Sequence, residues 1–307
     1  MGILLLIAGL VLLVLSGDGL VRFASGLAIK ATIPPVIVGL TIVSIGTSAP
    51  EIIASVRAAL EGNPGITVGN VIGSNITNVL LIGGLTALVL PLCCAPSTVR
   101  RDGAILVVAT FFVLVLAYVF EFLPRWSGAL LLLAMVVHTI VIFRFGRDDG
   151  VEEAPNVAWG WGLASLTLFG GLLVLVVGGQ AFIYGAVELA EAIHVPEAII
   201  GATVVAIGTS LPELFASIAA ARQGHRDVVI GNIVGSNLTN IMLVLGLVAF
   251  IEPLPVASEL YHSSLLLFGA TSVLFVGLLV AGKNIGRWIG FGFLVTFAAY
   301  LSFSLLT

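Results

Sequence analysis

The chain has 307 residues, of which 59% are hydrophobic and only 9% are charged, and its mean hydropathy is +1.21. Such values exclude a soluble globular domain and indicate an integral membrane protein, with the lipid bilayer as its surroundings. The strands of a membrane barrel would be about 10 residues long and would alternate apolar with polar residues, a pattern that is absent here. We therefore expect an all-α fold, without a cofactor, a nucleic-acid partner or an obligate protein partner.

Long apolar runs separated by short charged or proline-containing breaks predict ten transmembrane helices, since a helix needs about 20 apolar residues to cross a bilayer. The first run lacks a positive leading region and a small-residue cleavage site, so we expect it to remain in the membrane. In chain order, the predicted spans are residues 2–26, 33–58, 65–91, 102–120, 127–143, 158–190, 196–221, 227–250, 261–281 and 286–306.

Positive charges predict how these spans cross a cell (inner) membrane. With ten spans, Arg57 and Arg125 fall on one side of the membrane and the other ten Lys and Arg residues fall on the opposite side. Loops rich in Lys and Arg stay in the cytoplasm, so both termini are expected outside. The hydrophilic loop at residues 144–157 is then a cytoplasmic linker. An alternative interpretation of its acidic residues is a regulatory cation site formed by Asp148, Asp149, Glu152 and Glu153.

The sequence contains an internal repeat, the feature to seek first in any chain. "PPVIVGLTIVSIGTSAPEIIAS" begins at Pro34 and "PEAIIGATVVAIGTSLPELFAS" begins at Pro196, an offset of 162 residues. The same offset carries "GNVIGSNITN" at Gly69 onto "GNIVGSNLTN" at Gly231. Each half contains five spans, so the second half enters the membrane inverted, as in secondary transporters whose site lies at the midplane. The predicted units are residues 1–143, the linker 144–157, and residues 158–307.

The "GTSAPE" segment combines a helix-breaking proline with a carboxylate inside a membrane span. Pro50 cannot donate a backbone hydrogen bond and bends the helix, which frees a carbonyl group. Thr47 and Glu51 are four residues apart and share a helical face. A carboxylate there costs from about 2.5 to more than 10 kcal/mol, so it needs a cation, a proton or both. The second half repeats the arrangement with Pro212, Thr209 and Glu213.

Two carboxylates and two threonine hydroxyls offer about six hard oxygen atoms, within the range of roughly 6–8 that Ca²⁺ takes. Spans 3 and 8 provide a second wall, because their polar residues recur every four positions on one helical face. Neutral oxygens of this kind suit monovalent ions, although Ser and Asn in membrane helices also serve only to join helices. The residues of this wall are Asn70, Ser74, Asn78, Asn232, Ser236 and Asn240.

Other polar residues within the spans leave several interpretations open. Asp18 either makes a local hydrogen bond or lies along an ion path, and His138 is expected to be packed rather than to bind a metal. A catalytic role is not expected, because Ser48 and Ser210 have no repeated His or Lys base near them in sequence. A passive cation channel or a cation-sensing receptor would be an alternative class, although channels more often form their filters by symmetry around a pore.

The motifs "GTSAPE" with "GNVIGSNITN" and "GTSLPE" with "GNIVGSNLTN" resemble those of the cation/calcium antiporter superfamily, in particular prokaryotic sodium/calcium exchangers. The resemblance covers nearly the whole chain and implies ten helices, outward termini and exchange of Ca²⁺ for Na⁺ by alternating access. It implies that Glu51, Glu213, Thr47 and Thr209 hold Ca²⁺. It further implies that Na⁺ is held by the same glutamates together with Ser48, Ser74, Ser210 and Ser236.

One departure from that family concerns Asn78 and Asn240, which contribute to Na⁺ binding or to the wall of the site. Many relatives carry an acid at one of these positions, whereas both are amides here. The predicted site therefore has a formal charge of −2 from Glu51 and Glu213, which one Ca²⁺ or two Na⁺ would neutralise. The stoichiometry stays open, and so does the alternative of an antiporter that exchanges H⁺ for Ca²⁺ or for another divalent cation.

Overall fold

The fold was analysed in a computed structural model of the whole chain. It describes residues 1–30, 33–93, 96–145, 161–194, 206–256 and 262–306. The predicted linker at 144–157 lies almost entirely outside this part, as do the acidic residues Asp148, Asp149, Glu152 and Glu153. The first ten residues of the predicted span 196–221 also lie outside it.

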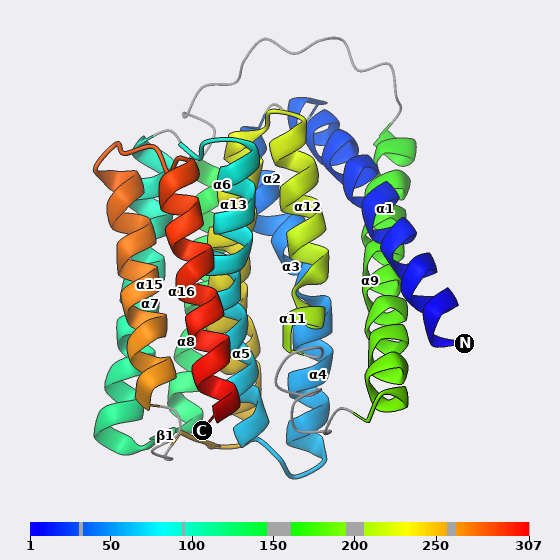
Figure 1. Cartoon of the computed structure of the whole chain (residues 1–307). Coiled ribbons are helices and arrows are strands. Elements are labelled where there is room, and N and C mark those ends of the chain that lie inside the picture. Colours follow the sequence, from blue (N-terminus) through cyan, green and yellow to red (C-terminus); the bar gives the residue numbers. More distant parts are fainter. Residues whose placement is uncertain (31–32, 94–95, 146–160, 195–205, 257–261, 307) are drawn as a thin grey trace.

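The described part is built from helices, as the sequence predicts (Figure 1). In the first half they are α1 (Gly2–Lys30), α2 (Pro35–Val38), η1 (Gly39–Val43), α3 (Ser44–Thr47), α4 (Ala49–Leu60), α5 (Gly65–Thr77), η2 (Asn78–Ile82), α6 (Gly83–Val89), α7 (Pro96–Phe120) and α8 (Arg125–Phe145). In the second half they are α9 (Trp161–Ala192), α11 (Ala206–Thr209), α12 (Leu211–Arg222), α13 (Arg226–Leu238), η5 (Thr239–Leu245), α14 (Gly246–Ile251), α15 (His262–Val280) and α16 (Arg287–Leu306).

Seven continuous helical stretches are long and apolar enough to cross a membrane, counted over the described residues. An eighth span is formed by 36–47 and 49–60 if these two pieces, which meet at 44°, are taken together. The apolar stretch 287–303 is shorter. The chain is therefore an all-helical membrane protein, and the total of ten spans stays a prediction.

Two kinds of irregularity interrupt the central helices. Ser48 and Ser210 leave helical geometry, with ψ of 7° and 6°, where new helices begin with Pro50 and Pro212 as their second residues. The described residues also contain three wider π-helical turns, and two of these, η2 and η5, begin within one residue of equivalent places in the repeat. Such turns often mark functional sites, since they re-aim side chains within a helix.

Helices α1 and α9 lie side by side at one edge of the molecule, while α7, α8, α15 and α16 lie at the other (Figure 1). Glycines permit the close antiparallel approach of α1 to α9. A Cβ atom on Gly9 would lie 2.4 Å from the backbone nitrogen of Phe182, and one on Gly185 would lie 2.4 Å from that of Leu6. The broken helices α3–α4 and α11–α12 occupy the middle, and α1 also packs against α12.

Short backbone contacts join loops from the two halves at each end of the helices. Strand β1 (Phe122–Leu123) pairs antiparallel with β2 (Leu254–Pro255), a small ribbon that the sequence did not predict. At residues predicted to lie on the opposite side of the membrane, Leu92 forms a β-bridge with Ile285, and the Arg287 Nε donates to the Leu88 carbonyl over 3.2 Å.

Candidate cation site

The two glutamates of the repeated motif lie in the first turns of α4 and α12, directly after the breaks in the helices. Both are buried, with Glu51 and Glu213 each 1% exposed. The free N–H groups and the dipole of a helix N-terminus favour a carboxylate at this position. Among the residues that the structure describes, no Arg, Lys or His forms an ion pair with either glutamate.

The two halves bind each other's glutamate through the serine of the motif. The Ser48 hydroxyl donates to Glu213 Oε1 over 2.9 Å, and the Ser210 hydroxyl donates to Glu51 Oε1 over 3.3 Å. A serine at the start of a helix usually caps its own helix. Here neither serine does so, and each instead reaches across to the other half. The predicted half-sites are therefore joined into one site by reciprocal contacts.

Several buried oxygen atoms at this junction have no hydrogen-bond partner. They include the second carboxylate oxygens of both glutamates, the hydroxyls of Ser74 and Ser236, and the amide oxygens of Asn78 and Asn240. Buried polar atoms in proteins are almost always paired, so an unpaired group needs an explanation. The segments that carry these atoms pack together, α4 against η5 and α12 against η2. A hard cation would provide the missing partner of these oxygens, whereas the amide nitrogens of Asn237 and Asn240, which are also unpaired, cannot bind one.

The threonines and Asn232 complete the surroundings of the carboxylates. The side chains of Thr47 and Thr209 also reach Glu213 and Glu51, respectively. The Asn232 amide group donates to Ser217 Oγ over 2.9 Å and to the backbone oxygen of Glu213 over 3.2 Å. Asn232 thus holds in place the helical turn that carries Glu213.

The polar wall on α5 and α13 contains two further asparagines that were not singled out from the sequence. The Asn78 amide group donates to Asn237 Oδ1 over 2.9 Å, so the contact joins the two halves. Asn75, at the equivalent position to Asn237, donates to the Val71 carbonyl over 2.7 Å. Both asparagines lie inside the repeated "GSNxTN" segment, and identity across the repeat was the signal that pointed to them.

The two halves of the site are not equally buried. On the first half, Ile66 is 58% exposed and Asn70 is partly exposed, whereas their equivalents Val228 and Asn232 are 2% and 1% exposed. A Cβ atom on Gly235 would lie 2.7 Å from the backbone of Leu40. Helix α13 thus packs closely against α2 and η1, while the residues equivalent to these two segments, 197–205, lie outside the described part.

The other candidate residues lie in different surroundings. Within the described ranges, no group of three or more His, Cys, Asp or Glu side chains could hold a metal, so a cation in the site must rely on two carboxylates and neutral oxygens. The backbone carbonyl of Asp18 accepts a hydrogen bond of 3.1 Å from the Gln223 amide group.

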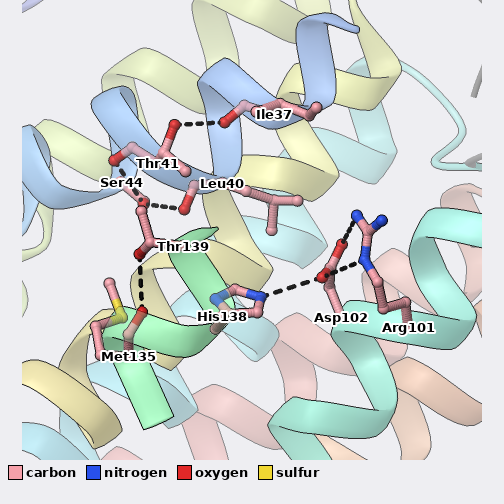
Figure 2. Close-up of polar contacts among 9 residues, drawn as sticks. All are labelled: Ile37, Leu40, Thr41, Ser44, Arg101, Asp102, Met135, His138 and Thr139. Atoms are coloured by element: carbon pink, nitrogen blue, oxygen red, sulfur yellow. Dashed lines mark hydrogen bonds and ion pairs between the residues drawn. The ribbon is translucent and has the colours of Figure 1, made fainter. Parts of the chain in front are cut away.

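A second buried polar cluster lies between α7 and α8 (Figure 2). Asp102 accepts two hydrogen bonds of 3.0 Å from Arg101, and its Oδ1 lies 3.1 Å from His138 Nε2. His138 is thus a packed, hydrogen-bonded residue, as expected, whereas its partner Asp102 was not predicted. Thr41 and Ser44, also drawn in Figure 2, bond to carbonyls of their own helix and so differ from the serines of the site.

Comparisons with known proteins agree with this arrangement. A family model described as sodium/calcium exchanger protein matches residues 1–144 and 163–306. The chain is 33% identical over 341 residues to the sodium/calcium exchanger MaX1 of Methanosarcina acetivorans, covering 97% of each chain. It is 38% identical to the putative antiporter CaxA of Alkalimonas amylolytica, covering 96% of this chain and 95% of the relative.

A solved structure of the sodium-calcium exchanger NCX_Mj, soaked with Na⁺ and Ca²⁺, is similar with a TM-score of 0.86 at 30% identity. It covers 98% of this chain, and 97% of that chain is matched. The Inner membrane protein YrbG of Escherichia coli is 36% identical over 310 residues, covering 96% of this chain and 95% of the relative. These relatives are exchangers, an antiporter and a membrane protein rather than enzymes, as expected from the sequence. The chain belongs to the sodium/calcium exchanger protein family.

Proposed function

We propose that this protein is a secondary active antiporter that exchanges Ca²⁺ for Na⁺ at a site between its two GTSxPE motifs. The observation that carries the proposal is the pair of buried glutamates, Glu51 and Glu213, each held by a serine of the other half and each keeping one unpaired carboxylate oxygen. A buried carboxylate without a basic partner needs a cation to offset its desolvation. The relatives named as sodium/calcium exchangers support Ca²⁺ and Na⁺ as those cations.

Ligand chemistry divides the site between the two ions. Ca²⁺ prefers several hard oxygens including carboxylates, so we assign it to the two glutamates with Thr47 and Thr209. The neutral unpaired oxygens suit Na⁺, which is less charged. We assign Na⁺ to Ser48, Ser210, Ser74 and Ser236 together with the glutamates, and Asn78 and Asn240 either bind Na⁺ or line the site. The formal charge of −2 is balanced by one Ca²⁺ or by two Na⁺.

Alternating access is proposed from the inverted repeat itself, because two halves of inverted topology can open a site between them to either side in turn. We therefore propose ten spans in two inverted five-helix repeats, residues 1–143 and 158–307, joined by the linker 144–157.

The orientation in the membrane follows from the positive charges. We propose that both termini lie outside the cell membrane and that the central loop lies in the cytoplasm. Contacts between loops support this assignment, because each joins residues predicted to lie on the same side. Leu92 pairs with Ile285 among the cytoplasmic loops, and β1 pairs with β2 among the outer ones.

Flux measurements in proteoliposomes test the exchange. Vesicles loaded with Na⁺ should take up radiolabelled Ca²⁺ when diluted into Na⁺-free medium, and vesicles loaded with choline at equal osmolarity should not. Glu51→Gln should abolish this uptake, because it removes one of two charges that hold Ca²⁺. Glu61→Gln, directly after the same helix, is a matched control, since Glu61 is exposed and pairs with Arg57. Full uptake by Glu51→Gln would refute the proposed site.

Protons are the second candidate counter-ion. One oxygen of each buried glutamate is unpaired, and a proton bound there would neutralise the carboxylate as a cation does. Imposing a pH gradient in the complete absence of Na⁺ separates the two exchange reactions. Ca²⁺ uptake that follows the pH gradient and ignores Na⁺ would replace Na⁺ by H⁺ in the proposal, while uptake that requires Na⁺ would exclude H⁺ as the main counter-ion.

A further inference from the structure

Two buried carboxylates provide the formal charge of the central site. Glu51 and Glu213 are each 1% exposed, and among the described residues no group of three or more His, Cys, Asp or Glu side chains could hold a metal. Asp102 is paired within its own cluster between α7 and α8. Asp18 binds Gln223 through its backbone, and Gln223 follows Glu213 by ten residues, or about 15 Å along a helix. The formal charge of the site is therefore −2.

The amides of Asn78 and Asn240 add oxygens to this site without adding charge. Both residues are at most 1% exposed, and the Oδ1 of each is unpaired. The segment of Asn78, η2, packs against α12 of the second half, and the segment of Asn240, η5, packs against α4 of the first. A carboxamide has nearly the shape of a carboxylate but does not ionise. The two amides thus keep the charge at −2, where a single acid would make it −3.

The unpaired oxygens of the site form two equivalent sets, one from each half of the repeat. Each set contains one carboxylate, one hydroxyl and one amide oxygen. The sets are Glu51, Ser74 and Asn78 in the first half and Glu213, Ser236 and Asn240 in the second. One monovalent cation neutralises the single charge of one set, and one Ca²⁺ shared between the sets neutralises both. Oxygen ligands and charge therefore both suit two monovalent cations or one Ca²⁺.

Other loads would leave an unbalanced charge inside the protein. Three monovalent cations would leave +1, and an empty site would leave −2. A buried charge without a partner is strongly unfavourable. The first turns of α4 and α12 disfavour excess positive charge further, because helix N-termini themselves carry partial positive charge. Only the two balanced loads are then expected to cross the membrane, and since the empty site does not cross, the two fluxes are coupled.

We propose that this exchanger carries two monovalent cations for each Ca²⁺ and moves no net charge across the membrane, with Asn78 and Asn240 setting that ratio by remaining neutral. The inference rests on the proposed exchange function and deepens it by fixing the ratio of the ions. It applies to Na⁺ and to H⁺ alike, because each carries one charge. The membrane potential then neither drives nor opposes the transport of Ca²⁺.

The ratio can be measured as the Ca²⁺ gradient at which net flux of radiolabelled Ca²⁺ stops. With a Na⁺ gradient of about tenfold across proteoliposomes and no membrane potential, flux should stop at a Ca²⁺ gradient of about 100-fold, the square of the Na⁺ gradient. A potential of about 100 mV, set with K⁺ and valinomycin, should leave this balance unchanged. Exchange of three ions for one would balance near 1,000-fold and would shift by roughly 50-fold at that potential, and either result would overturn the proposal.

A pH gradient replaces the Na⁺ gradient if Na⁺ drives no Ca²⁺ flux, and a difference of about one pH unit should again balance a Ca²⁺ gradient of about 100-fold. A balance near 1,000-fold would again contradict the ratio. A wild-type protein that exchanges Ca²⁺ for neither Na⁺ nor H⁺ would instead refute the proposed function. The two failures are therefore distinguishable, because only the first requires measurable exchange.

Variants of Asn240 test whether the amides set the ratio. In the purified protein, the apparent Kd for Ca²⁺ should rise with about the second power of the Na⁺ concentration, because two Na⁺ replace one Ca²⁺. Asn240→Asp adds a carboxylate and should raise this power to about three at alkaline pH, where the new acid is ionised. Asn240→Ser, the matched control, adds no charge and should keep the second power. A third power in the wild type, or a second power in Asn240→Asp, would overturn the role of the amides.

Discussion

The two halves of the central site carry nearly the same sequence but pack differently. "GTSAPE" and "GTSLPE" place Glu51 and Glu213 in the same position after the same break, and each glutamate is equally buried. Beyond the glutamates the halves differ in their asparagines, because the Asn78 amide group donates to Asn237 while that of Asn240 is unpaired. Local sequence therefore determines which groups enter the site, while the packing of neighbouring helices determines which of them pair.

The largest expected effect is a loss of Ca²⁺ binding, and it should be the same when either half loses its glutamate. Glu51→Gln and Glu213→Gln should each weaken Ca²⁺ binding by about 2–5 kcal/mol, or roughly 30-fold to several thousand-fold, because each removes one buried charge from a shared ion. Equilibrium binding of radiolabelled Ca²⁺ measures both. A variant that loses binding while its counterpart keeps it would show that the ion is held by one half alone.

The polar cluster of Arg101, Asp102 and His138 is present only in the first half. Changing it should lower the stability of the fold without affecting ion binding. At the offset of the repeat, Ser263, Ser264 and Tyr300 stand where the first half has Arg101, Asp102 and His138. Asp102→Ala would leave the guanidinium and imidazole groups without their acceptor, at a cost of about 3–5 kcal/mol of unfolding free energy. Ser264→Ala should be nearly silent. Thermal unfolding in detergent measures both, and equal stability of the two variants would contradict the structural role of Asp102.

The close contact between α13 and η1 can be tested at a glycine. Gly235→Ala places a Cβ atom 2.7 Å from the backbone of Leu40 and should lower the free energy of unfolding by about 1–3 kcal/mol. Gly292→Ala is the control, because Gly292 is exposed on α16 and its added Cβ atom would meet nothing within 4 Å. Thermal unfolding in detergent measures both, and equal stability of the two variants would contradict the close packing at Gly235.

The smallest effect is expected when Asn78 or Asn240, the amides that stand where many relatives carry an acid, is replaced by Asp. Asn240→Asp raises the formal charge of the site from −2 to −3 and should tighten Ca²⁺ binding by about tenfold, since carboxylate count is a main determinant of Ca²⁺ affinity. Asn78→Asp adds the same charge but loses the nitrogen that donates to Asn237, so its gain should be smaller. Titration of both variants with Ca²⁺ compares them, and a larger gain for Asn78→Asp would contradict this account of Asn78.

Much of this fold and site could be predicted because the signals are strong and repeated. Helix spans follow from apolar length, and the breaks at Ser48 and Ser210 follow from the prolines. The reciprocal bonds from these serines could not be predicted, because they depend on how the two halves meet in space. Asp102 was missed because it lies next to Arg101, so the sequence indicates only a charged helix end. Its contact with His138 comes from another helix and is visible only in the structure.

The side-chain bonds of the wall also lay beyond the sequence. Asn75 and Asn237 stand at equivalent positions of the repeat, yet Asn75 donates to the Val71 carbonyl and Asn237 accepts from Asn78. Whether an amide pairs within its own helix or across the two halves depends on how the helices meet in space. The π-helical turns η2 and η5 were likewise not predicted.

Calorimetric titration of the purified protein with Ca²⁺ tests the central claim most directly, because a single site shared by both halves has a defined stoichiometry. We expect one Ca²⁺ per chain, displaced by Na⁺, and no measurable binding at the same concentrations by Glu51→Gln or by Glu213→Gln. Two independent Ca²⁺ ions per chain, each lost with only one of the glutamates, would contradict the shared site.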